Sequence, residues 1–116
     1  MLKNNSLLKN AGYINGQWIG ADSDNRFDVK NAYSQELIST LPQMGKEETN
    51  SAIEAANNAW PNWRNKTAKE RAAILRKWFN LILENQEDLA ILMTLEQGKP
   101  LAEARGEVAY GSSFIE

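Results

Sequence analysis

The segment from Thr67 to Glu116 constrains the fold of this chain most, because its expected helices have recognisable starts. Glu70 follows Thr67 by three residues, so the Thr67 hydroxyl can accept a hydrogen bond from the third amide of a helix. The Glu70 carboxylate can in turn accept one from the Thr67 amide. Apolar residues then recur at helical spacing up to residue 84. This capping box predicts a helix over residues 68–84.

Two further helices are expected after this one. Asn85 is a candidate N-cap, and residues 87 and 88 are acidic, which suits the positive end of a helix dipole. Gly98 can adopt the left-handed conformation that ends a helix, and Pro100 has a φ already fixed for starting the next one. The last pattern stays helical over 101–116 with no stop signal. We therefore expect a chain that is truncated in its last helix.

The N-terminal half predicts short strands. Asn15-Gly16 lies between β-prone residues and favours a type I′ hairpin turn. Residues 26–30 alternate in polarity, and 36–41 are β-prone up to Pro42, which is expected at the end of the strand or at a sheet edge. Together these strands predict one short antiparallel ribbon, which needs another element to lie on.

A fourth helix is expected between the ribbon and the capping box. Its apolar face is rich in alanine, which is typical of close approach to another helix, and we expect that helix to be 68–84. Pro61 has no N–H to donate, so the regular helix is predicted to end near Ala59. The two helices are expected to share a core of three tryptophans, namely Trp60, Trp63 and Trp78.

These elements define an α+β chain with a short antiparallel β ribbon and about four helices. Residues 1–12 are polar and are expected to form a loosely ordered N-terminal segment, and residues 13–116 form the structured part. A length of 116 residues lies in the single-domain range.

The composition excludes several kinds of chemistry. The sequence contains no cysteine and no histidine, and therefore no thiol nucleophile and no imidazole base. A net charge of −2 gives no field that would recruit nucleic acid or an anionic membrane. Residues 1–11 lack the apolar core and the cleavage pattern of a secretory signal, and no apolar run approaches the roughly 20 residues that span a bilayer. We expect a cytoplasmic protein without nucleic-acid or membrane partners.

The C-terminal segment also carries a resemblance to a known family. The relevant runs are T-A-K-E-R-A from Thr67 and M-T-L-E-Q-G-K-P-L-A-E-A from Met93, followed by Gly106-Glu107 and by residues 113–116. In these runs the chain resembles the N-terminal part of the aldehyde dehydrogenase superfamily, and it is most similar to succinate-semialdehyde dehydrogenases. The resemblance implies a fragment of the α/β aldehyde dehydrogenase fold, in which residues 13–116 belong to a coenzyme-binding and oligomerisation region.

The resemblance implies a function for a longer parent protein. The parent would be a homo-oligomer that oxidises succinate semialdehyde to succinate with NAD or NADP, using a cysteine thiolate and a glutamate-activated water. This chain has no cysteine and no glutamate matching the general-base motif, so we expect it to be inactive alone and to bind no cofactor. Two alternatives stay open, namely an aldehyde dehydrogenase with another substrate and a non-catalytic helical interaction module.

The last helix supplies one set of candidate site residues. Glu103, Glu107 and Tyr110 are spaced to share a face, with Gly111 and Phe114 beside them. Solvated acidic residues are the simpler interpretation. The resemblance implies instead that the helix borders the aldehyde entry tunnel, with Glu107 and Gly111 in its wall.

The resemblance also supplies candidates for a monovalent cation, which some family members bind partly through main-chain oxygens. The corresponding positions are Asp28, Val29 and Glu96. The acidic pairs at 47–48 and 87–88 are explained by helix dipoles and predict no metal site. The Gly98-Lys99 pair lacks the second glycine and the Lys-Ser/Thr ending of a phosphate-binding loop, and it predicts a helix junction.

Overall fold

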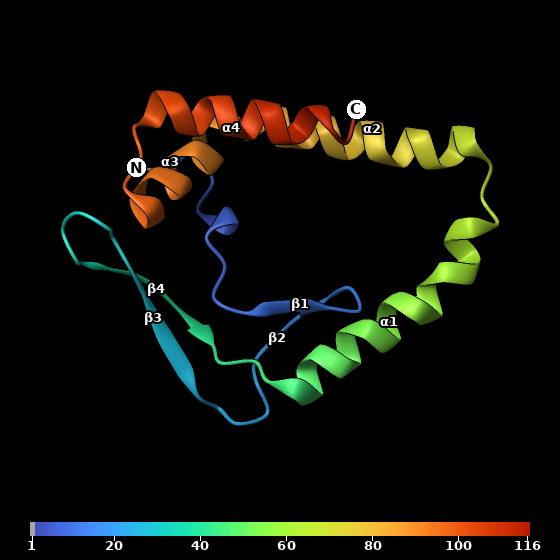
Figure 1. Cartoon of the computed structure of the whole chain (residues 1–116), viewed down its shortest axis with the longest axis horizontal. Helices are drawn as coiled ribbons and strands as arrows, with labels where there is room; N and C mark the ends of the chain where they lie inside the picture. Colours follow the sequence, from blue (N-terminus) through green and yellow to red (C-terminus); the bar gives the residue numbers. More distant parts are fainter. Residues whose placement is uncertain (1) are drawn as a thin grey trace.

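A computed structural model describes residues 2–116 and confirms the expected α+β composition. Helix α2 and helix α4 lie along one edge of the molecule, α1 runs down a second edge, and the strands close the third (Figure 1). No helix within residues 2–116 is long and apolar enough to cross a membrane. The elements in chain order are η1 (Asn5–Leu7), β1 (Gly12–Ile14), β2 (Gln17–Ile19), β3 (Arg26–Lys30), β4 (Leu37–Pro42), α1 (Lys46–Arg64), α2 (Ala68–Glu84), α3 (Gln86–Gln97) and α4 (Leu101–Ser113).

The strands form two separate antiparallel hairpins where the sequence predicted one ribbon. Strand β1 pairs with β2, and β3 pairs with β4. The first turn has the positive φ values of a type I′ turn, 51° at Asn15 and 77° at Gly16, as predicted. The hairpins separate because the segment after β2 turns toward α1, where Ala21 is buried and the Asp22 amide donates to Glu48.

Helix α2 has the bounds and the start that the sequence predicted. The Thr67 amide donates to Glu70 Oε2 at 2.7 Å, and the Glu70 amide donates to Thr67 Oγ1 at 3.3 Å. At its other end, Asn85 is the N-cap residue of α3, as predicted. The Asn85 side chain makes no cap bond to α3 and instead donates to the Leu81 carbonyl oxygen at 2.8 Å. Asn85 therefore closes α2 with its side chain.

Helix α3 ends as predicted, and α4 ends earlier than predicted. Gly98 has φ 76° and is the left-handed C-cap of α3. Pro100 is the N-cap of α4, which stops at Ser113 and does not continue to residue 116. The hydroxyls of Ser112 and Ser113 donate to the carbonyl oxygens of residues 109 and 110, and such side-chain bonds compete with helical ones.

Two predictions about α1 are wrong. The helix does not end near Ala59 but continues through Pro61 to Arg64. Pro61 is exposed in the last turn, where the helix loses one hydrogen bond and little else. The shared tryptophan core does not form either. Trp60 and Trp78 are 53% and 55% exposed, because α1 contacts β1 and does not pack along α2.

The buried core lies between α3 and α4. Ala90 and Ala104 are both 0% exposed, and Val108 is buried beside them. Small side chains at the contact allow the two helices to approach closely, so that α4 has a fixed orientation. Larger side chains of α2, α3 and α4 surround this centre, namely Ile82, Leu89, Met93 and Leu101.

The N-terminal segment lies against α3. The Lys3 and Asn4 amides donate to the two carboxylate oxygens of Asp88 at 2.9 and 2.7 Å. The prediction that residues 1–12 are loosely ordered stays a prediction, and Met1 lies outside the described residues.

Candidate functional site

The two sets of residues singled out from the sequence lie on different elements. Glu107 and Gly111 are on α4, Asp28 and Val29 are on β3, and Glu96 is near the end of α3. Neither set contains a thiol nucleophile or an imidazole, because the sequence has no cysteine and no histidine. Within residues 2–116, no group of three or more acidic side chains is placed to hold a metal ion. Both sets can therefore line or shape a site, but they cannot supply the thiolate chemistry of a cysteine.

Helix α4 presents the predicted acidic and aromatic face to the outside. Tyr110 and Phe114 pack edge to face, with ring centroids 4.8 Å apart, and both rings are largely exposed. The Glu107 carboxylate forms an ion pair with the Lys99 ammonium. A Cβ added at Gly111 would meet no atom within 4 Å, so Gly111 leaves open space at the edge of this face.

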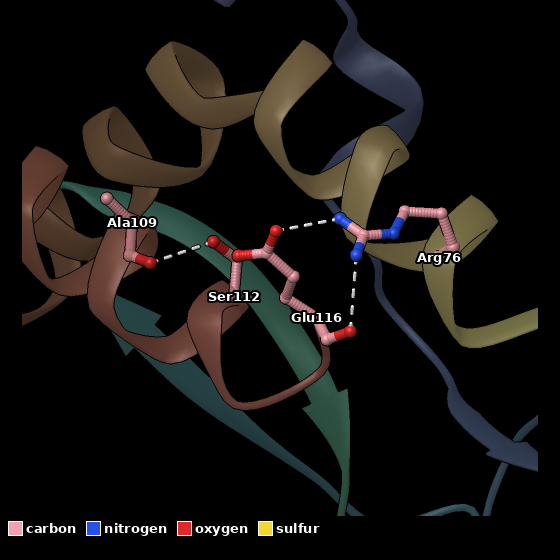
Figure 2. A network of polar contacts seen from close by, with 4 residues as sticks. All are labelled: Arg76, Ala109, Ser112 and Glu116. Carbon is pink, nitrogen blue, oxygen red and sulfur yellow. Dashed lines mark hydrogen bonds and ion pairs between the residues drawn. The ribbon is translucent and has the colours of Figure 1, made fainter. Parts of the chain in front are cut away.

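Contacts on the buried side of α4 fix its orientation. Ala104, Val108 and Ser112 follow one another at helical spacing and are all buried. Figure 2 shows the C-terminal end of this arrangement, where Ser112 Oγ donates to the Ala109 carbonyl oxygen at 2.8 Å. The guanidinium of Arg76 on α2 donates to Glu116 Oε1 at 2.9 Å. These contacts hold α4 against α2, so Glu107 and Gly111 are kept away from the core.

The β3–α3 junction brings two of the three cation candidates together. The Ala32 amide donates to the Leu95 carbonyl oxygen at 2.9 Å and joins the end of β3 to α3. Val29 and Glu96 line the same pocket of about 290 Å³. Asp28 is exposed and pairs across the hairpin with Thr40. Because the side chains of neighbouring residues in a strand point to opposite faces, the Asp28 side chain points away from the Val29 side chain and from the pocket that Val29 lines.

The Gly98–Pro100 junction does not fit a phosphate or nucleotide group. Lys99 is already paired with Glu107, and Pro100 at the N-cap has no N–H to donate. Gly98 uses its left-handed φ to end α3, and a Cβ added there would lie 3.2 Å from the Ala32 Cβ. The junction is structural, as the sequence predicted.

Sequence reasoning missed what the acidic residues at helix starts do. Glu48 is buried and accepts hydrogen bonds from the Asp22 and Gly45 amides, each at 2.7 Å. These bonds, the one from Asp22 first, hold the pKa of Glu48 below its usual range. The sequence indicated only that Glu48 suits the dipole at the start of a helix. No local signal could have indicated that Asp22 is also a partner.

Asp88 and Glu87 make comparable long-range contacts. The amides of Lys3 and Asn4, in that order, lower the pKa of the buried Asp88 carboxyl. Glu87 accepts two bonds of 2.7 Å from the Arg105 guanidinium, which lowers the pKa of Glu87 and raises that of Arg105. The acidic first turn of α3 therefore holds both the N-terminal segment and α4.

Comparison with known proteins gives a consistent result along the chain. Residues 18–116 match the model of the aldehyde dehydrogenase family. Over 115 residues, 99% of this chain, it is 57% identical to a glutarate-semialdehyde dehydrogenase of Pseudomonas putida. Over the same length it is 54% identical to an NADP(+) succinate-semialdehyde dehydrogenase of Escherichia coli. In both cases the match covers 24% of the relative.

Solved structures agree with this match. An NADP-dependent enzyme of Escherichia coli superposes on 100% of this chain with a TM-score of 0.97 and 53% identity. A succinate-semialdehyde dehydrogenase of Burkholderia pseudomallei superposes on 99% with a TM-score of 0.96 and 57% identity. The chain corresponds to 24% of each of these structures, so it spans about a quarter of the length of the proteins that it matches.

Proposed function

Because this chain belongs to the aldehyde dehydrogenase family, we propose that it is the N-terminal part of an NAD(P)-dependent succinate-semialdehyde dehydrogenase. The observation that carries the proposal is the identity of 54–57% over nearly the whole chain to enzymes named for succinate and glutarate semialdehyde. The full-length enzyme would oxidise succinate semialdehyde to succinate and pass a hydride to the nicotinamide coenzyme.

A neighbouring substrate is the second candidate, and specific relatives favour it. The relative at 57% identity is named for glutarate semialdehyde, and another at 51% is named for 3-sulfolactaldehyde. All three names describe aldehydes that carry an acidic group. We therefore place the substrate among short aldehydes with an anionic end, with succinate semialdehyde first.

The residues of this chain would support the reaction and would not perform it. Without cysteine there is no thiolate to attack an aldehyde, and the Gly98–Pro100 junction does not fit a coenzyme phosphate. The chain alone would then be inactive and would bind no coenzyme. In the longer enzyme, Glu107 and Gly111 would form part of the wall of the aldehyde entry tunnel, which the exposed α4 face and the open space at Gly111 support.

The β3–α3 junction would hold a monovalent cation in the longer enzyme. The pocket shared by Val29 and Glu96 and the bond between Ala32 and Leu95 support this proposal, since β3 and the residues after it lie next to α3. The Asp28 side chain points elsewhere, so this residue would contribute through its main chain. A dependence of activity on K⁺ that Glu96→Gln weakens would test the site.

We also propose a cytoplasmic homo-oligomer. The exposed aromatic side chains of the first hairpin, Tyr13 and Trp18, together with Phe27 of β3 support a contact between subunits. Apolar faces that stay uncovered in this chain would also favour self-association when it is prepared alone. Light scattering that showed only compact monomers of the full-length enzyme would contradict the homo-oligomer. The same result for this chain alone would contradict its self-association.

One experiment tests the enzymatic proposal directly. The reading frame that encodes this chain and whatever follows it is expressed and assayed by reduction of NAD⁺ or NADP⁺ with succinate semialdehyde, glutarate semialdehyde and an uncharged aldehyde of equal length. We expect the two acidic aldehydes to give the higher kcat/KM. A product that reduces neither coenzyme with any aldehyde would favour the remaining alternative, a non-catalytic helical interaction module.

A further inference from the structure

The turn between β1 and β2 contains the one Asn-Gly pair of the sequence. Asn15 is exposed, and a Cβ added at Gly16 would meet only the Tyr13 hydroxyl, at 4.0 Å. Gly16 is therefore not crowded by side chains from outside the turn. We propose that Asn15 is a site of spontaneous deamidation and isomerisation to isoaspartate, whose rate is controlled by opening of the β1–β2 hairpin.

The chemistry needs only the two turn residues and water. The Gly16 backbone nitrogen loses its proton and attacks the Asn15 side-chain carbonyl carbon, and the bond from that carbon to the amide nitrogen breaks as ammonia leaves. Glycine suits this step because it has no Cβ to hinder the approach. Water then opens the resulting succinimide ring at one of its two carbonyls, which gives aspartate or isoaspartate. No oxidant or reductant takes part.

The hairpin opposes this reaction while it is closed. Ring closure requires rotation about the Asn15 backbone, which the turn holds at φ 51° between paired Ile14 and Gln17. The ladder contains only three residue pairs, and a hairpin of this size is marginal without other support. Contacts between β1 and α1 supply that support. Local opening of the hairpin is thus a step before the chemistry.

The product would damage the hairpin that controls its formation. Isoaspartate adds one atom to the backbone of the turn and leaves a carboxylate in place of a neutral amide. A type I′ turn fixes the register of the strands, so a longer turn displaces the Tyr13–Trp18 pair, whose rings lie 5.0 Å apart. Once formed, isoaspartate should therefore keep the hairpin open.

Ageing of the chain at neutral pH, followed by tryptic mapping, tests the proposal. Cleavage after Lys9 and Arg26 releases one peptide that carries Asn10, Asn15 and Asn25, so two internal controls share every condition. Isoaspartate is located by fragmentation and by methyl transfer from an isoaspartyl carboxyl methyltransferase. We expect it at residue 15 ahead of the other two asparagines, with complete loss of methyl acceptance there in Asn15→Gly. This variant keeps a turn sequence that type I′ geometry accepts.

A second arm repeats the ageing in denaturant, where we expect faster conversion of Asn15. Equal rates of Asn15 conversion in the folded and denatured chain would contradict the proposal that opening of the hairpin controls the rate. Two outcomes would contradict Asn15 as a deamidation site of the folded chain. One is conversion of Asn10 or Asn25 as fast as that of Asn15. The other is a folded chain in which Asn15 stays intact while the denatured chain reacts.

Discussion

Helix α1 and the α3–α4 pair both carry an apolar stripe, yet only the pair buries it. Ala90 and Ala104 are fully enclosed between α3 and α4, whereas Ile53 and Trp60 of α1 are exposed, and the main packing partner of α1 among the helices and strands is β1. The one buried residue of α1 is Glu48, in its first turn. Apolar residues at helical spacing thus predict that one face of a helix is buried, but they do not identify the element that packs against it.

Enlarging a buried alanine should reveal this difference most strongly. Ala104→Leu places extra atoms where both Ala104 and its neighbour Ala90 are fully enclosed, so we expect the free energy of unfolding to fall by about 1–3 kcal/mol. Urea unfolding followed by circular dichroism measures the change.

The matched control is Ala56→Leu on α1. Ala56 is exposed, and leucine has nearly the helix propensity of alanine, so the free energy should change by no more than about 0.5 kcal/mol. Equal losses in the two variants would mean that α1 is as tightly packed as the α3–α4 pair.

A pair of glycine variants should act in opposite directions. Gly98→Ala forces a side chain into φ 76° and against the Ala32 Cβ at 3.2 Å, which should destabilise the chain by about 1–2 kcal/mol. Gly106→Ala lies inside α4 with no atom within 4 Å of the new Cβ and should stabilise it by about 0.5–1 kcal/mol. Thermal unfolding of both proteins measures the effects. A loss of stability in Gly106→Ala would contradict the open surface described there.

Removing the N-cap of α2, the helix that connects α1 to the α3–α4 pair, should have a smaller effect. Thr67→Ala deletes the hydroxyl that accepts from the Glu70 amide and should cost about 1 kcal/mol. The loss should fall on α2, so hydrogen exchange should accelerate in its first turn while the amides of α1 are unchanged. Faster exchange along α1 would show that α1 and α2 unfold together.

Lowering the pH should weaken one set of carboxylate hydrogen bonds in each region, those of Glu48 at the start of α1 and those of Asp88 in α3. The folded pKa values of Glu48 and Asp88 are lowered, so each carboxylate stabilises the fold fully above its unfolded pKa, about 4, and loses that contribution as the pH falls through the folded value. The Lys3, Asn4 and Asp22 amide resonances should shift over this range. In Asp88→Asn the Lys3 and Asn4 shifts should no longer titrate while Asp22 still does. Titration of all three in that variant would contradict the assignment.

Features that depend on neighbours in sequence could be predicted, and features that depend on distant partners could not. The Asn15-Gly16 turn, the Thr67 cap and the Gly98 stop each follow from a few adjacent residues, and the structure contains all three. The end of α1 was predicted wrongly because an exposed last turn tolerates Pro61.

Distant partners account for the remaining differences. The spacing of Trp60 and Trp78 shows which way each faces on its own helix but not whether the helices meet. For the candidate site, the sequence identified the shared face of α4, and the meeting of Val29 with Glu96 came only from the family resemblance. The roles of Glu48 and Asp88 depend on partners up to 85 residues away, for which no local pattern exists.

The bonds from Lys3 and Asn4 to Asp88 join the beginning of the chain to a residue 84 or 85 positions later. During synthesis, Lys3 and Asn4 leave the ribosome long before Asp88, so they have no place to dock until α3 has followed them. Such late contacts slow folding, since a long loop must close before they form. An affinity tag fused to the N-terminus would lie beside this late contact, and a tag at the other end would spare it.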